Sequence, residues 1–156
     1  MQNIKTQSFK NKRVLLRVDF NVPLNDYQEI TDISRINAAI PTIERVIVSG
    51  GISIIISHLG RPKGKDSSLS LYPVAKKLAQ ILNKNVIVLE DCIGEKVRSK
   101  INNSAYEEIY LLENLRFYKE ETIGDVVFAK ELASLADVYI NDAFGTSHRA
   151  HASTYG

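Results

Sequence analysis

The apolar residues of this chain fall into two alternating patterns: short unbroken runs and longer stretches with helical spacing. Apolar runs rich in β-branched residues at 13–20, 52–57, 86–89, 109–112 and 137–141 are typical of strands buried on both faces. Between the first two runs, isoleucines recur every three or four positions from Ile33 to Ile47, which predicts a helix. Comparable spacing predicts further helices at 70–83, 93–101 and 125–136.

Local signals place the ends of the first predicted helix. The polar residues at 31–34 can cap its start, and Gly50-Gly51 is expected to end it. Pro41 lies inside the helical pattern, so we expect it to kink the helix or to move its start. Residues 60–70 are polar and contain glycine, which predicts a loop.

Strands that alternate with helices indicate βαβ units. We therefore expect an α/β fold: a three-layer α/β/α domain with a mainly parallel sheet and helices on both faces. A chain of 156 residues is one ordinary domain, and its 44% hydrophobic and 24% charged residues are typical of globular proteins. We find no repeats, low-complexity tracts or internal linkers, so residues 1–156 are expected to form a single domain.

Charge and cysteine content narrow the class of protein. The net charge of +2 gives no global basic field of the kind that binds nucleic acid. The one cysteine, Cys92, cannot form an intrachain disulfide, which suits a reducing compartment. The longest unbroken apolar run is too short to span a bilayer, and residues 1–13 are polar and basic. These features predict a soluble, cytoplasmic protein.

Polar and charged residues gather where the predicted strands end. They are Asp19, Asn21 and Arg35 after the first strand, His58, Arg61 and Lys63 after the second, Asn114 and Arg116 after the fourth, and Asn141, Asp142, His148 and Arg149 after the fifth. Because ligands of open α/β sheets bind outside the carboxyl ends of the strands, we expect these side chains to meet at one edge. The third strand instead delivers Glu90 and Asp91.

These residue types predict the chemistry of the ligand. Guanidinium groups match phosphate and carboxylate groups through two parallel hydrogen bonds. Asp19 and Asn21 suit a hydroxyl group: Asp19 would accept a hydrogen bond from it, and Asn21 could donate one to it. The sequence therefore predicts a small hydroxylated and phosphorylated acid as ligand. Arg17 lies within the first strand, where we expect a buried ion pair.

Nucleotide and metal motifs are missing from the sequence. No G-x-G-x-x-G occurs, and residues 60–66 differ from a P-loop because three residues rather than four separate the glycines and Asp66 follows the lysine. The histidines His148 and His151 have no cysteine or third histidine beside them. We therefore expect no metal site and no cofactor on this chain.

Five sequence motifs at these strand ends resemble those of the phosphoglycerate kinases. They are residues 17–24 (RVDFNVPL), 31–36 (TDISRI), 57–64 (SHLGRPKG), 111–117 (LLENLRF) and 141–151 (NDAFGTSHRAH), in the family's order and along the whole chain. The resemblance implies a glycolytic kinase with two Rossmann-like domains that close about a hinge. That family transfers a phosphoryl group between 1,3-bisphosphoglycerate and Mg-ADP, giving 3-phosphoglycerate and Mg-ATP.

The same resemblance implies that this chain is the N-terminal, 3-phosphoglycerate-binding domain, cut off before the nucleotide-binding domain. Mg-ADP or Mg-ATP would bind the missing domain, and the fragment alone would be an inactive monomer. Asp19 and Asn21 would hold the hydroxyl end of the substrate. A basic cluster would surround the non-transferred phosphate, formed by His58, Arg61, Arg116 and Arg149. Arg35 would face the carboxyl group and act catalytically on the phosphoryl group in flight.

Structural alternatives remain for single residues and for the whole chain. Asp19 could cap a turn, His58 could be a satisfied loop histidine, and Arg116 could pair with Glu113 or Glu120. As a whole, the chain could be a phosphate-binding module, which would not select 3-phosphoglycerate over phosphate. It could also be a non-catalytic remnant that acts through a partner, such as the missing half supplied as a separate chain.

Overall fold

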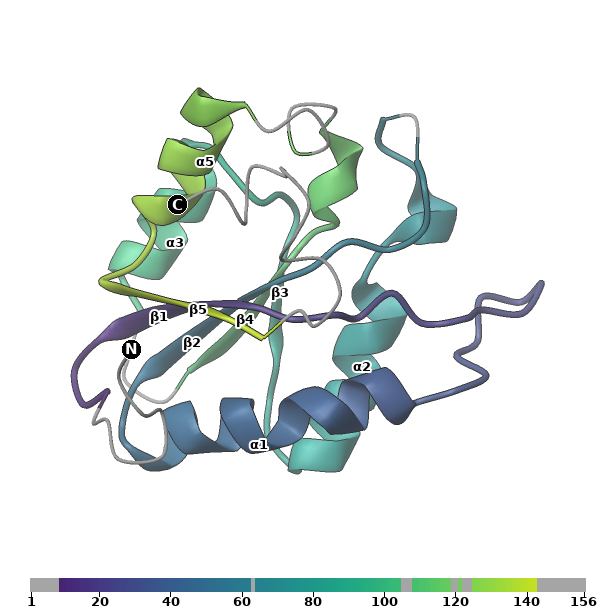
Figure 1. The fold of residues 1–156 in the computed structure, drawn as a ribbon, viewed down its shortest axis with the longest axis horizontal. Coiled ribbons are helices and arrows are strands. Elements are labelled where there is room, and N and C mark those ends of the chain that lie inside the picture. The colour runs from purple at the N-terminus through teal and green to yellow at the C-terminus, as the bar shows by residue number, and fades with distance from the viewer. Residues whose placement is uncertain (1–8, 63, 105–107, 119–120, 122–124, 143–156) are drawn as a thin grey trace.

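One parallel sheet organises the molecule (Figure 1). The structure is a computed structural model that describes residues 9–62, 64–104, 108–118, 121 and 125–142. Within these residues, five strands pair in parallel in the order β3-β4-β2-β1-β5. The strands are β1 (Arg13–Arg17), β2 (Ile52–Ile56), β3 (Ile87–Leu89), β4 (Ile109–Leu112) and β5 (Val138–Asn141). Because all run the same way, their carboxyl ends share one edge.

Helices cover both faces of the sheet (Figure 1). Helices α1 (Ser34–Val48) and α2 (Tyr72–Leu82) lie on one face, and α3 (Glu95–Asn102) and α5 (Val126–Ala133) lie on the other. Short 3₁₀ turns occur at Ser67–Leu69 and Leu115–Phe117. The predicted three-layer α/β/α arrangement, a Rossmann-like fold, is confirmed.

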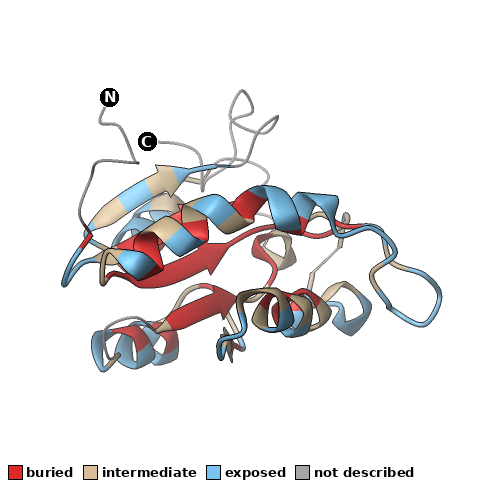
Figure 2. Ribbon diagram, turned by 90° about the horizontal axis from the view of Figure 1, so that it is seen from below, coloured by how far each residue is buried: buried red, intermediate tan, exposed pale blue. Residues whose placement is uncertain are grey.

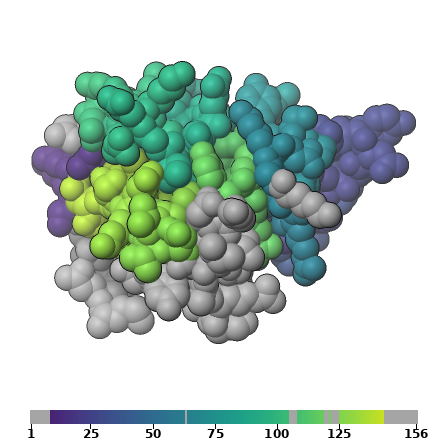
Figure 3. All heavy atoms as spheres, turned by 90° about the horizontal axis from the view of Figure 1, so that it is seen from above, coloured from purple at the N-terminus to yellow at the C-terminus, as the bar shows by residue number. Residues whose placement is uncertain are grey.

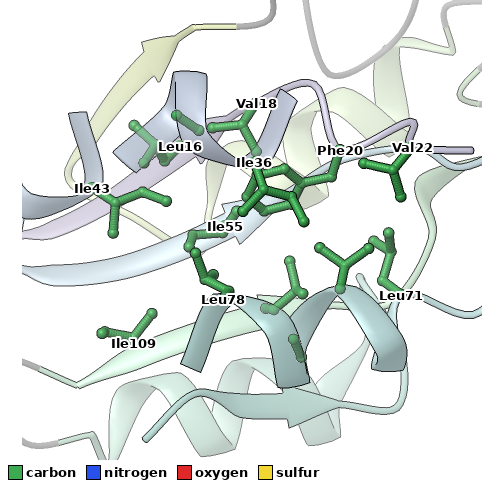
Figure 4. Close-up of a cluster of buried hydrophobic side chains, with 14 of the residues drawn as sticks. Leu16, Val18, Phe20, Val22, Ile36, Ile43, Ile55, Leu71, Leu78 and Ile109 are labelled. Atoms are coloured by element: carbon green, nitrogen blue, oxygen red, sulfur yellow. The ribbon is translucent and has the colours of Figure 1, made fainter. Parts of the chain in front are cut away.

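The two largest clusters of buried apolar side chains form layers, one on each face of the sheet. Figure 4 shows the layer between the sheet and the first two helices, where Leu16, Ile36, Ile55 and Leu78 point toward one another and are fully buried. Tyr110 and residues of α3 and α5 form the layer on the opposite face. Each fully buried aliphatic side chain contributes about 1.5–3 kcal/mol to folding, so these layers hold the strand ends in place.

Burial differs between the strands (Figure 2). Strands β2 and β4 are buried at every position, whereas β5 alternates between half-buried and exposed residues. The unbroken apolar runs of β2 and β4 predicted this correctly, because a strand between two helical layers has no solvent face. The same expectation for residues 137–141 is wrong, because β5 lies at the edge of the sheet. Within the described residues, no helix is long and apolar enough to cross a membrane.

Three details differ from the sequence-based expectations. Strand β1 ends at Arg17 rather than Phe20, and beyond it the Phe20 N–H donates to the Ser57 side chain and not to a strand backbone. Helix α1 starts near the expected position and continues through Pro41, whose side of the helix is exposed. Ile33, an apolar residue, occupies the N-cap position, and the predicted side-chain cap comes from Asp32, whose Oδ1 atom accepts from the Ser34 N–H at 2.9 Å.

A hairpin that the sequence analysis did not predict precedes α1. Leu24 and Ile30 form an antiparallel bridge, and the Asn25 side chain accepts hydrogen bonds from the backbone of Tyr27 and Glu29. Figure 3 shows this segment projecting from one end of the molecule, coloured indigo. Tyr27 at its tip is 84% exposed.

Candidate functional site

The carboxyl ends of β1, β2 and β4 form a continuous edge that we call the rim. It comprises residues 19–21, 58–61 and 114–116 and the side chain of Arg35 at the start of α1. These segments are far apart in the sequence, and hydrogen bonds between them, described next, hold them together. The rim is the edge at which ligands of parallel α/β sheets bind.

The first two loops of the rim are joined directly. The Phe20 backbone N–H donates to Ser57 Oγ at 2.9 Å, and the Gly60 N–H donates to Asn21 Oδ1 at 2.8 Å. Because Asn21 Oδ1 accepts this hydrogen bond, the NH2 group of the Asn21 amide is the part that would donate to a ligand. This agrees with the expectation that Asn21 donates.

Arg35 reaches from α1 to the end of β1. Its Nη1 atom donates to the Asn21 carbonyl oxygen at 2.7 Å and lies 3.3 Å from Asp19 Oδ1. The side chains of Arg35 and Asp19 are 51% and 25% exposed, so solvent reaches this ion pair. Asp19 also accepts from the Asn21 backbone N–H at 3.0 Å, which is the turn-capping contact considered above as its structural alternative.

Gly60 connects Arg116 to the same network. Arg116 Nη1 donates to the Gly60 carbonyl oxygen at 3.5 Å, and exposed Arg61 is the next residue along the chain. Gly60 has a φ of +63°, and a Cβ atom there would lie 2.8 Å from Leu69 Cδ2. Only glycine fits this position without strain. The sequence analysis gave Gly60 no role, although a glycine just after a buried strand was the available signal.

Asn114 fastens the loop after β2 to the end of β4. Its side chain is buried and accepts from the Leu59 N–H at 3.1 Å and the Arg116 N–H at 3.0 Å. Its amide group donates to the carbonyl oxygens of Leu59 at 2.7 Å and Leu69 at 2.9 Å. A buried amide satisfied on both ends holds its neighbours firmly. The sequence analysis placed Asn114 at a strand end without recognising this bracing role.

Glu113, considered above as a partner for Arg116, binds the start of α2. Its carboxylate accepts from Ser70 Oγ at 2.7 Å and from the Leu71 backbone N–H at 2.8 Å. Ser70 in turn accepts from the Tyr72 N–H at 3.1 Å. The long loop after β2 is thereby tied at both of its ends to the segment that follows β4.

A buried ionic network lies beneath the rim. Arg17 and Glu121 form an ion pair at 3.2 Å with both side chains 0% exposed, which confirms the buried ion pair predicted for Arg17. His58 is 5% exposed, and its Nδ1 atom lies 3.2 Å from Arg17 Nη2. His58 therefore packs inward against Arg17, whereas Arg35 and Arg61 lie at the surface.

Some predicted site residues fall outside the described part of the chain. His148 and Arg149 lie beyond residue 142, and Lys63 is also outside the described residues. Of the other predicted residues, the structure brings Asp19, Asn21, Arg35 and Arg116 into one hydrogen-bonded network through Gly60, with Arg61 beside it. Three arginines and one aspartate leave the described rim with a net positive charge.

Potential metal ligands and the cysteine are two further groups to consider among the described residues. Among residues 9–142 as far as they are described, no three histidine, cysteine, aspartate or glutamate side chains are grouped to hold a metal ion. Burial, and next the nearby Asp91 carboxylate, raise the pKa of the Cys92 thiol well above its usual range. A thiol of that kind is a poor nucleophile at neutral pH.

Comparisons with known proteins point to one family. The family model for phosphoglycerate kinase matches residues 4–156. Phosphoglycerate kinase of Dictyoglomus turgidum is 56% identical over 154 residues, which are 99% of this chain and 39% of that protein. The Aquifex aeolicus enzyme of the same name is 50% identical over 154 residues, with the same two coverages of 99% and 39%. The chain thus spans about two fifths of the length of these curated relatives.

Solved structures show the same fold. The phosphoglycerate kinase of Coxiella burnetii superposes with a TM-score of 0.84 at 38% identity, over 96% of this chain and 37% of that one. The Pyrococcus horikoshii enzyme gives a TM-score of 0.88 at 35% identity, over 98% and 39%. Matched by one family model over nearly all of its residues, and sharing its fold with these solved members, the chain belongs to the phosphoglycerate kinase family.

Proposed function

We propose that this chain is the 3-phosphoglycerate-binding domain of a glycolytic phosphoglycerate kinase, and that the rim is its binding site. One observation carries this assignment: Arg35, Asn21, Gly60 and Arg116 form a continuous chain of hydrogen bonds across three strand ends. Residues up to 95 positions apart in the sequence are linked there by hydrogen bonds within the protein.

The polarity of the rim fits the three chemical groups of 3-phosphoglycerate. Arg61, which follows Gly60 in the sequence, and Arg116, which donates to the Gly60 carbonyl oxygen, provide the donors for the phosphate group. Asp19 and Asn21 accept from and donate to the hydroxyl group. Arg35 binds the carboxyl group from the opposite side. The family resemblance adds to the phosphate site Arg149, which lies outside the described residues, and His58, whose Nδ1 atom faces Arg17 so that Nε2 is the ring nitrogen that would face the phosphate.

Arg35 is poorly explained by a structural role alone. It lies in the first turn of α1, which contains no acidic residue, and a cation is disfavoured at a helix N-terminus by the helix dipole. Its ion pair with Asp19 is exposed, and such pairs contribute only about 0.2–1 kcal/mol to stability. Arg35 can therefore leave Asp19 and pair with the carboxylate of a ligand at a small cost in free energy.

In the whole enzyme, Arg35 would also stabilise the phosphoryl group during transfer to and from Mg-ADP. Phosphoryl transfer depends on positioning and on neutralising charge, and an arginine at the transferring group contributes roughly 10³–10⁵ in rate. The nucleotide would bind a part of the enzyme outside these 156 residues. The chain alone is accordingly expected to bind 3-phosphoglycerate weakly and not to turn over.

Calorimetric titration of the chain with 3-phosphoglycerate tests the assignment. Each charge-assisted hydrogen bond is worth about 1.5–3 kcal/mol, so we expect Arg61→Ala to weaken binding roughly 10–100-fold and Arg35→Ala to weaken it less. Arg149→Ala should behave like Arg61→Ala. The matched control is Arg98→Ala, which removes the same charge from an exposed position on α3.

Two results would contradict the assignment in different ways. Equal affinity for inorganic phosphate, glycerol phosphate and 3-phosphoglycerate would indicate a simple anion-binding module. Equal losses from Arg61→Ala and Arg98→Ala would show that net charge, and not the rim, attracts the ligand. Activity that appears only when the rest of the enzyme is added as a separate chain would support the division of the enzyme into two binding domains.

A further inference from the structure

Arg17 is buried beneath the rim in a position from which it cannot touch a ligand. Its side chain is 0% exposed, with Nη1 3.2 Å from Glu121 Oε2 and Nη2 3.2 Å from His58 Nδ1. Arg17 therefore joins a carboxylate that lies 104 residues away in the sequence to the histidine that the proposed function assigns to the phosphate site.

The chemistry of arginine determines which nitrogen of His58 carries the hydrogen. A guanidinium group has N–H donors and no acceptor, so His58 Nδ1 must accept this hydrogen bond with its lone pair. The hydrogen of a neutral imidazole then lies on Nε2. A proton added to Nδ1 would face an N–H of Arg17 and bring two positive charges together.

We infer that Arg17 is a positioning residue that holds His58 in the Nε2–H tautomer, with Glu121 as the counter-ion that keeps Arg17 in place. In that tautomer Nε2 carries a hydrogen-bond donor, the group from which a phosphate oxygen accepts, and not a lone pair that would repel it. The identity of the ligand rests on the proposed function, whereas the tautomer of His58 follows from the buried contact alone.

The tautomer can be measured on the unaltered chain without any ligand. Long-range proton–nitrogen correlation NMR at neutral pH distinguishes protonated from unprotonated ring nitrogens, and the signals of His58 among the three histidines are those lost in His58→Gln. We expect an unprotonated Nδ1 and a protonated Nε2. A proton on Nδ1, alone or with one on Nε2, overturns the inference.

Two variants separate the donor from the ion pair. Glu121→Gln keeps the Arg17 donor, so the His58 tautomer should be unchanged. Replacing Arg17→Met together with Glu121→Leu removes the donor and its counter-ion at once, so neither charge of this pair is left without the other. In that double variant we expect a mixture of His58 tautomers. We also expect the dissociation constant for 3-phosphoglycerate to rise about tenfold, which is no larger than the rise expected for His58→Ala.

A double-mutant cycle shows whether Arg17 acts through His58. Adding His58→Ala to the Arg17→Met, Glu121→Leu variant should weaken binding by less than about twofold more. The inference is contradicted if replacing Arg17 and Glu121 weakens 3-phosphoglycerate binding by the same factor whether or not His58 is present. The buried pair would then only support the fold. If the unaltered chain shows the expected tautomer but does not bind 3-phosphoglycerate, the proposed function fails and the positioning of His58 stands.

Discussion

Two arginine–carboxylate pairs of nearly equal length lie a few residues apart at the end of β1, one beneath the rim and one on it. Arg17 and Glu121 are 3.2 Å apart and 0% exposed, while Arg35 and Asp19 are 3.3 Å apart and 51% and 25% exposed. The same chemistry therefore serves two purposes. In the buried pair, each charge is stabilised by its partner and not by water, so separating the two would cost much free energy. In contact with water, the rim pair can open to a ligand at small cost.

The largest difference is expected when one carboxylate of each pair is removed. Glu121→Ala leaves the Arg17 guanidinium buried without its counter-ion, so the free energy of unfolding should fall by about 3–5 kcal/mol. Asp19→Ala should lower it by less than about 1 kcal/mol. Urea denaturation of the two variants measures both. Similar losses in the two variants would show that burial does not separate the pairs.

The bracing of the rim should have the next largest effect. Asn114→Ala removes four hydrogen bonds of a buried amide and leaves the backbone N–H and carbonyl groups of Leu59 without these partners. We therefore expect the free energy of unfolding to fall by about 2–3 kcal/mol. The control is Asn103→Ala, whose side chain makes an exposed contact with the Ser99 carbonyl oxygen. A loss for Asn114→Ala as small as that for the control would mean that the rim does not depend on this amide.

Removing Arg35, the cation of the rim pair, should weaken ligand binding while leaving the free energy of unfolding nearly unchanged. Arg35→Ala is expected to change the free energy of unfolding by less than about 1 kcal/mol and to weaken 3-phosphoglycerate binding by up to about tenfold. Denaturation and calorimetry on the same preparation give both values. A large loss of stability with unaltered binding would reverse the roles assigned to the two arginines.

The geometry of the pairs shows what the sequence could predict. The apolar runs predict the strands, and a parallel sheet places their ends on one edge, so residues that follow different strands, such as Asn21 and Arg116, were expected together from the sequence alone. The contact between Arg17 and Glu121 could not be predicted, because residues 104 positions apart meet only through the packing of the whole fold. Periodicity also says nothing about which way a loop residue faces, and His58 turned inward.

A third pair at the opposite end of β1 should give the smallest effect. The Arg13 backbone N–H, and after it the Arg13 side chain, lower the pKa of Asp137 from its ordinary value of 3.8. A carboxyl group with a lowered folded-state pKa contributes stability above that ordinary value, which is lost as the pH falls through the folded-state pKa. Asp137→Asn should therefore flatten the acid end of the stability profile. An unchanged acid limb in urea denaturation would show that this pair contributes nothing.

The central claim is that the rim, and no other surface of the chain, binds 3-phosphoglycerate. Titration of the isotope-labelled chain with this ligand, followed through backbone amide chemical shifts, tests it most directly. We predict the largest shifts at residues 19–21, 35, 60–61 and 116, with α3 and the hairpin tip at Tyr27 unaffected. Shifts centred away from these residues, or none at a saturating ligand concentration, would contradict the claim.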